Sequence, residues 1–142
     1  MSRWPVGLSL VVSLGACTDI GDPTLMADEL APAGPLSFEQ HIRPILHANG
    51  CLGCHPAGGG HGGLDVSSPE AMKRGGQSGR PAVVECEHDA SYLWTRVRWC
   101  EMPSPGYPKC IDPVEVATIA RWIDQGGRAI YEPGACPDAP LE

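Results

Sequence analysis

Two cysteines separated by two residues and followed directly by a histidine, Cys51-Leu52-Gly53-Cys54-His55, constrain this chain more than any other stretch. In such a motif each thiol adds to one vinyl group of a porphyrin, because the two-residue gap matches the separation of the vinyl groups, and the histidine supplies an axial nitrogen to the iron. A zinc site would need a second ligand pair at suitable spacing, and a thioredoxin-like motif would need a βαβ context. Neither is evident, so the motif predicts one covalently attached haem c bound by Cys51, Cys54 and His55.

The composition fits a small domain that is completed by a cofactor. The chain has 142 residues, a single Phe and only 6% aromatic residues, together with 18 Gly and 15 Pro. This composition predicts many loops and a thin core, which a buried porphyrin would fill. The net charge of −7 argues against nucleic acid as a partner. Seven cysteines indicate an oxidising compartment.

The first 16 residues have the pattern of an export signal. Arg3 precedes an apolar run from Val6 to Leu14, which is too short to span a bilayer. The run ends in Leu14-Gly15-Ala16-Cys17, which resembles a bacterial lipobox and implies that Cys17 is acylated after cleavage; the alternative is an ordinary signal peptide that contains a cysteine. We therefore expect residues 1–16 to be a lipoprotein signal peptide. The mature protein would lie on the periplasmic side, anchored by lipid to the inner or outer membrane.

Residues 17–36 are predicted to form a flexible acidic tether. They mix Asp and Glu with Pro and Gly, and no apolar period of 2 or 3.6 persists. The folded domain is therefore expected to span residues 37–142.

Helical patterns recur through this domain. Ser37 starts the first with capping-box spacing, Pro44 lies inside it, and Asn49-Gly50 should end it just before the haem motif. A short helix with proline at its first position is expected over residues 68–73. Residues 112–127 have the clearest pattern, with an N-terminal Asp-Pro and a terminal Gly-Gly. We predict an all-α, cytochrome c-like domain of three to five helices wrapped around one haem, rich in loops and stapled by disulfides.

Met102 is the predicted sixth ligand of the iron. It lies in a stretch with three prolines and a glycine, which is stiff and non-helical. Met72 is the rival, although it falls in a short helix, where methionine usually fills the core. Four histidines are further candidates for the sixth ligand: His41, His47, His61 and His88. Of these, His61 in a glycine-rich loop could best approach the iron. The simpler interpretation is that all four are surface side chains or are hydrogen-bonded within the fold.

These residues together resemble the class I-like cytochrome c domains of planctomycete-type and other Gram-negative exported proteins. The resemblance covers about residues 37–136 and rests on Ile42-Arg43-Pro44-Ile45-Leu46, the haem motif, and Gly62-Gly63-Leu64-Asp65-Val66. It extends to residues 75–84, which look like the glycine-rich loop at the haem edge, and to residues 91–97, which look like the family's short internal helix. It also places Leu64 and Pro81 against the haem. It also identifies Met102 with the family's methionine ligand. One departure is that the family commonly has Met-Pro-Pro before Gly, whereas this loop is one residue longer.

Four cysteines remain after the haem and lipid cysteines are assigned: Cys86, Cys100, Cys110 and Cys136. An even remainder in an exported domain predicts two disulfides. Cys100 and Cys110 flank the Met102 loop, so a bridge between them would clamp the ligand and leave Cys86 to pair with Cys136. Pairing Cys86 with Cys100 and Cys110 with Cys136 is nearly as plausible, and free thiols are the third alternative.

Two classes of function follow from a haem site of this kind. A six-coordinate His/Met iron has no open position, so we expect a monomeric electron carrier that meets redox partner proteins and is not an enzyme. The alternative is a haem enzyme or gas sensor, such as a peroxidase-like protein, with a displaceable sixth ligand. A second Cys-x-x-Cys-His, which a dihaem peroxidase would require, does not occur in the sequence.

Overall fold

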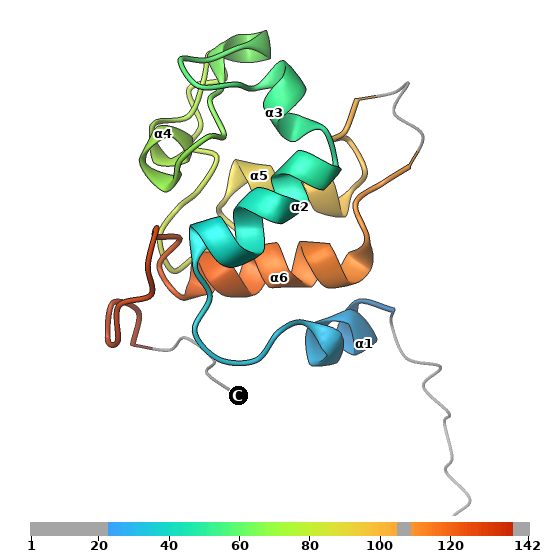
Figure 1. Cartoon of the computed structure of the whole chain (residues 1–142), viewed down its shortest axis with the longest axis vertical. Helices are drawn as coiled ribbons and strands as arrows, with labels where there is room; N and C mark the ends of the chain where they lie inside the picture. Colours follow the sequence, from blue (N-terminus) through green and yellow to red (C-terminus); the bar gives the residue numbers. More distant parts are fainter. Residues whose placement is uncertain (1–22, 105–108, 138–142) are drawn as a thin grey trace, which may run out of the picture.

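The computed structural model describes residues 23–104 and 109–137, and within these ranges the protein consists of helices and loops without a strand (Figure 1). The prediction of an all-α domain is confirmed at this level. The predicted signal peptide and Cys17 lie outside the described residues. No helix in the described ranges has both the length and the apolar character needed to cross a bilayer. The elements in chain order are α1 (Pro23–Leu30), η1 (Phe38–Ile42), α2 (Arg43–Ala48), α3 (Cys51–Cys54), η2 (His61–Gly63), α4 (Pro69–Arg74), α5 (Tyr92–Arg98) and α6 (Pro113–Asp124).

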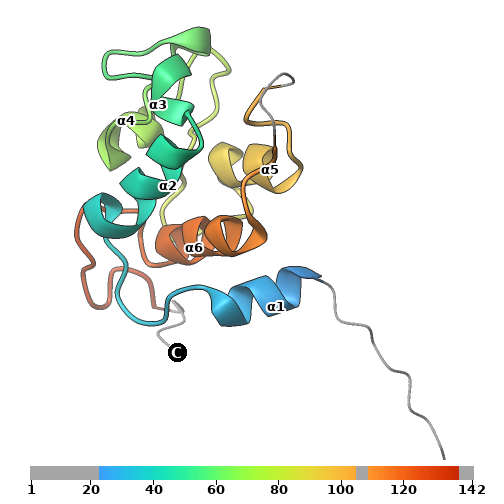
Figure 2. The ribbon, with the colours of Figure 1, turned by 45° about the vertical axis from the view of Figure 1, so that its right-hand side comes forward.

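Helix α6 forms the centre of the fold, between α1 on one side and α2 and α5 on the other (Figures 1 and 2). It begins as predicted: the Asp112 carboxylate accepts a hydrogen bond from the Val114 amide at 2.9 Å, and Pro113 occupies the first turn. Ile119 and Trp122 on its inner face are buried, and the Trp122 ring lies 5.9 Å from that of Phe38 in η1. The apolar stripe read from the sequence is therefore the core face of this helix.

The predicted first helix is divided into two parts. The Ser37 hydroxyl accepts a hydrogen bond from the Gln40 amide at 3.4 Å and caps η1, which has π-helical geometry. The α-helix α2 then starts beside Pro44, because proline has no N–H to donate and its ring crowds the preceding turn. Gly50, with φ of 71°, ends α2 and turns the chain directly into α3.

Helices α4 and α5 complete the core above α6. The Ser68 hydroxyl accepts from the Ala71 amide at 3.2 Å and caps α4, with proline at the predicted first position. Met72 on α4 has no exposed surface and belongs to the main hydrophobic cluster. Ser91 precedes α5 and is fully buried, and its hydroxyl accepts from the Val84 amide at 2.8 Å. A side-chain cap therefore defines the start of α4, whereas the Ser91 side chain bonds to the preceding loop and does not cap α5.

The segment predicted as a disordered tether differs from that prediction in its described part. Residues 23–30 form α1, which packs along the side of α6 that faces away from α2 (Figures 1 and 2). Ala27, Ala31 and Leu36 are buried, with exposed fractions of 3%, 5% and 1%. The ordered domain therefore begins before Ser37.

Two buried polar side chains of α6 explain this correction. The Arg121 guanidinium, only 7% exposed, donates to the carbonyls of Asp28, Ala31 and Pro32 at 3.0–3.2 Å. The Gln125 amide accepts from the Leu36 amide at 2.8 Å and donates to the Gly34 carbonyl at 2.9 Å. These contacts give the backbone of residues 28–36 side-chain partners from α6, so the segment is ordered by a distant helix and not by its own pattern.

Both disulfides adopt the first of the two pairings considered from the sequence. Cys86 pairs with Cys136, and Cys100 pairs with Cys110. The first bridge joins Cys136, in the segment that follows α6, to Cys86. Cys86 itself lies beside α6, because its amide donates to the Ile123 carbonyl at 3.1 Å. The second closes the loop that contains Met102.

Candidate haem site

The haem motif forms a single helical turn at one wall of a cavity. Helix α3 comprises Cys51–Cys54, and the amide of His55 closes the turn by donating to the Cys51 carbonyl at 2.8 Å. Cys51 is half-buried, Cys54 is exposed, and neither forms a disulfide. Both cysteines and His55 line a cavity of about 390 Å³. The fold thus brings the three motif residues to one surface, as covalent haem attachment requires.

Helix α5 and the segment that follows it supply other lining residues of the same cavity. Leu93 and Val97 from α5 line it, and so do Met102, Pro103 and Ser104. Figure 2 separates the two sides, with α2 and α3 on one and α5 on the other. The cavity therefore collects the predicted methionine together with the motif histidine.

Met102 is held in place through its backbone. Its amide donates to the Arg96 carbonyl at 3.1 Å, and the preceding amide of Glu101 donates to the same carbonyl at 2.9 Å. The Ser104 hydroxyl lies 3.6 Å from the Met102 sulfur. These bonds fix the start of the loop to the last turn of α5, so the position of Met102 depends on how α5 ends.

The ionisation of the motif residues suits a covalently bound haem. Burial lowers the pKa of His55, because a desolvated imidazolium is disfavoured. A neutral imidazole keeps the nitrogen lone pair with which histidine binds a metal ion. Burial also raises the pKa of the Cys51 thiol to about 11, and the charges of Cys54 and Glu115 add to that effect. A neutral thioether at Cys51 fits this surrounding better than a thiolate does.

The loop after the motif is organised by Asp65. Its carboxylate accepts from the Gly58 amide and from the Ser67 amide, both at 2.8 Å. The Ser67 hydroxyl also donates to it, and this bond is the largest cause that lowers the pKa of Asp65. Leu64 beside it is half-buried and lines the cavity as expected.

Pro81 is exposed and does not line the cavity, whereas its neighbours Arg80 and Ala82 do. The Leu93 amide donates to the Ala82 carbonyl at 2.9 Å and holds this part of the loop against α5. The loop therefore contributes to the cavity through Arg80 and Ala82, and a contact of Pro81 with the haem stays a prediction.

The rival ligands separate clearly in the fold. Met72 is part of the core and does not line the cavity, in agreement with its interpretation as filler. His88 is bound to the Asp124 carboxylate at 2.8 Å, away from the motif, and neither His41 nor His47 lines the cavity. Only His61 of the four candidate histidines lines it.

Sequence reasoning missed an aromatic and basic group at the cavity. Tyr92 lines it together with Arg80 and Arg96, whose guanidinium carbons lie 4.3 Å and 5.2 Å from the centre of the tyrosine ring. Tyr92 and Arg96 are four residues apart on α5, so helical spacing alone could have placed them on one face. Two cations beside an aromatic ring form a site that suits negatively charged groups of a cofactor.

Comparison with known proteins agrees with this site. A family model described as Planctomycete cytochrome C matches residues 51–106, from the first motif cysteine through the Met102 loop. The match supports a cytochrome c-type domain with covalently attached haem c, and a haem-based electron carrier as its general function. No curated protein and no solved structure matches the chain.

Proposed function

We propose that this protein is an exported monohaem c-type cytochrome that passes single electrons between redox partner proteins and is not an enzyme. The observation that carries the proposal is the meeting of Cys51, Cys54, His55 and Met102 at one cavity. In this proposal the two cysteines hold the haem through thioether bonds, and His55 and Met102 are the axial ligands. Bound haem c supplies one-electron chemistry, because its iron exchanges an electron without a change of ligands.

The chain's own residues would shape this chemistry in three ways. The buried apolar side chains of Leu93, Val97 and Val66 in the lining would shield a bound haem from water on their side. A dry surrounding disfavours the oxidised centre, which carries one more positive charge, and so raises the reduction potential. A methionine ligand acts in the same direction relative to a second histidine. The net charge of −7 opposes both, but water and salt screen it.

Substitution of Met102 tests the ligand assignment. Met102→Ala should abolish the weak far-red absorption band of methionine-ligated ferric haem, lower the reduction potential and allow carbon monoxide to bind the ferrous protein. Met72→Ala is the matched control, because Met72 is buried in the core and does not line the cavity. An unchanged band in the Met102 variant would refute the assignment, and His61→Ala would be the next variant to measure. Carbon monoxide binding by the unmodified protein would favour the haem enzyme or gas sensor.

We further propose that Cys17 carries lipid and tethers the domain to a membrane on its periplasmic side. The lipobox-like sequence Leu14-Gly15-Ala16-Cys17 supports this part. Mass spectrometry of the membrane fraction should find an acylated peptide that begins at Cys17, and Cys17→Ser should prevent acylation. A mature N-terminus at another residue would contradict the proposal.

A further inference from the structure

The Cys100–Cys110 bridge joins the end of α5 to the start of α6. Cys100 follows the last turn of α5 with a φ of 56°, a left-handed conformation that residues other than glycine rarely adopt. Cys110 directly precedes Ile111, which is buried, and Asp112, which caps α6. The bridge therefore fixes both ends of the loop against the core, and Met102 is only two residues after Cys100.

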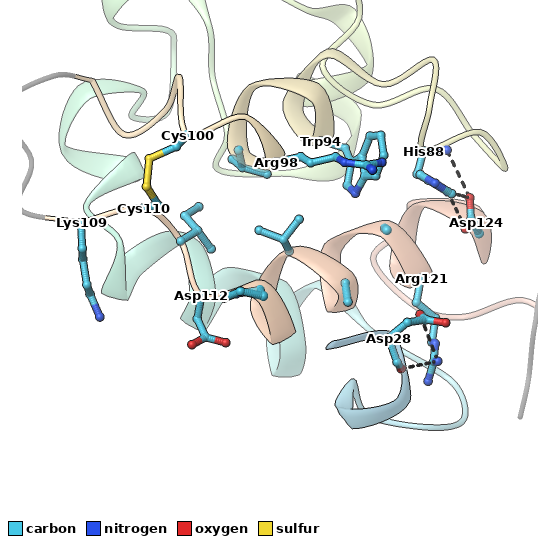
Figure 3. A pocket seen from close by; sticks show the side chains of 16 residues that line it. Asp28, His88, Trp94, Arg98, Cys100, Lys109, Cys110, Asp112, Arg121 and Asp124 are labelled. Carbon is cyan, nitrogen blue, oxygen red and sulfur yellow. Dashed lines mark hydrogen bonds and ion pairs between the residues drawn. A yellow bond between two sulfur atoms is a disulfide. The ribbon is translucent and has the colours of Figure 1, made fainter. Parts of the chain in front are cut away.

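The two disulfides of the protein differ in their access to solvent. Cys100 and Cys110 are both exposed, whereas Cys136 is 9% exposed and Cys86 is half-buried. Cys100 and Cys110 also line a groove of about 750 Å³ along the outer side of α5 and α6, and Figure 3 shows their bridge at one end of it. A thiolate must reach a sulfur atom to exchange with a disulfide. The groove gives that access to the loop bridge.

The groove carries charges of both signs. Arg98 and Lys109 line it together with three carboxylates, of which Asp28 pairs with Arg121, Asp124 bonds to His88 and Asp112 accepts from a backbone amide (Figure 3). The difference between the two bridges therefore lies in the access that each gives to an attacking thiolate.

We propose that the Cys100–Cys110 disulfide is a thiol-exchange site that controls whether Met102 is held at the haem. This inference rests on the His/Met ligation proposed above. A thiolate of a protein dithiol attacks the sulfur of Cys100, a mixed disulfide forms, and Cys110 leaves as a thiolate that takes up a proton. The second thiol of the dithiol then displaces Cys100, so that two electrons and two protons pass to the bridge and the dithiol becomes a disulfide. With the bridge open, the loop is no longer tied to the start of α6, and it is held only at its start, by the hydrogen bonds to the Arg96 and Val97 carbonyls, the Arg96–Glu101 ion pair and the packing of Met102 against the core.

The experiment uses the full-length holoprotein and a reduced dithiol protein of the thioredoxin type as the probe. Samples are quenched with iodoacetamide over time, and peptide mapping gives the extent of alkylation at each cysteine. The same samples are reoxidised with ferricyanide, after which the far-red methionine band and, on reduction, carbon monoxide binding are recorded. We expect Cys100 and Cys110 to become alkylated at least about tenfold faster than Cys86 and Cys136, because their sulfurs are more accessible to the attacking thiolate.

The fraction of the far-red band that is lost should be proportional to the fraction of Cys100–Cys110 bridges that have been opened. The double variant Cys100→Ala/Cys110→Ala should lack the band and, once its haem iron is reduced, bind carbon monoxide without any treatment by the dithiol protein. Its control, Cys86→Ala/Cys136→Ala, removes the other bridge and should keep the band. Equal alkylation rates at the two bridges, or a band that persists when the loop bridge is open, would overturn the inference. Absence of the band in the untreated, oxidised protein would instead refute the His/Met ligation on which it rests.

Discussion

Replacing Arg121 by methionine should release α1 from α6 and leave the haem site intact. The guanidinium of Arg121 donates to three backbone carbonyls of residues 28–32, and it is almost fully buried while doing so. Methionine has a similar apolar stem and a high helix propensity, so Arg121→Met removes the hydrogen bonds without a large cavity and without breaking α6. The change therefore isolates the polar contribution to docking of the segment.

The size of the effect follows from the three hydrogen bonds. Each contributes about 1 kcal/mol net, because the carbonyls of an undocked segment return to water, and the sum is about 3 kcal/mol. A loss of that size shifts the docking equilibrium by a factor of about 100. Arg121→Met leaves the apolar contacts of Ala27 and Ala31 in place. Helix α6 and the core on its other side should therefore keep their stability.

Amide hydrogen exchange of the folded holoprotein measures this shift. The amides of Ala31 and Leu36 report on docking, since the first bonds to the Ala27 carbonyl at 3.0 Å and the second to the Gln125 side chain at 2.8 Å. Both should exchange about 100-fold faster in Arg121→Met, whereas amides within α6 should not change. Arg98→Met is the control, because Arg98 stacks on Trp94 at 4.6 Å and forms none of the bonds to residues 28–32. Unprotected Ala31 and Leu36 amides in the unmodified protein would refute the reasoning and favour the original prediction of a flexible tether over residues 17–36.

Two further changes test the packing of the core. Cys86→Ser/Cys136→Ser opens a loop with a sequence separation of 50 residues, so the free energy of unfolding should fall by about 4 kcal/mol in a denaturant titration; a loss below about 1 kcal/mol would contradict the entropic argument. Gly127→Ala places a Cβ atom 2.6 Å from the Val83 side chain at a φ of 55°, and should lower stability by about 2–4 kcal/mol in thermal unfolding. Gly134→Ala, at a φ of 79° with nothing within 4 Å, is the control and should cost only about 1 kcal/mol; equal losses would exclude the contact with Val83 as the cause.

Signals that act within one turn of helix were sufficient to predict much of the fold. Ser37, Ser68 and Asp112 each cap a helix with their own side chain, so the start of that helix is written next to it in the sequence. The haem motif is equally local, because its three functional residues lie within five positions. These features could be assigned without knowledge of any partner.

Features that depend on tertiary contacts could not be assigned in this way. Helix α1 is ordered by Arg121, about ninety residues away, and an arginine on a predicted helix gives no sign that it will be buried against carbonyls. The sequence likewise does not show which residues of the loop over residues 75–84 line the cavity, where Arg80 and Ala82 do and Pro81 is exposed. The cysteine pairing stayed open for a related reason, since it depends on which helix ends meet in space.

Covalent attachment of haem is the central claim and can be measured directly. The holoprotein, made in cells with a haem-maturation system, is extracted with acid-acetone, digested and analysed by mass spectrometry. The account predicts that the haem stays with the protein and that the peptide containing Cys51 and Cys54 carries it, whereas Cys51→Ala/Cys54→Ala releases it. Haem that extracts into the solvent from the unmodified protein, or an unmodified Cys51–His55 peptide, would contradict the account.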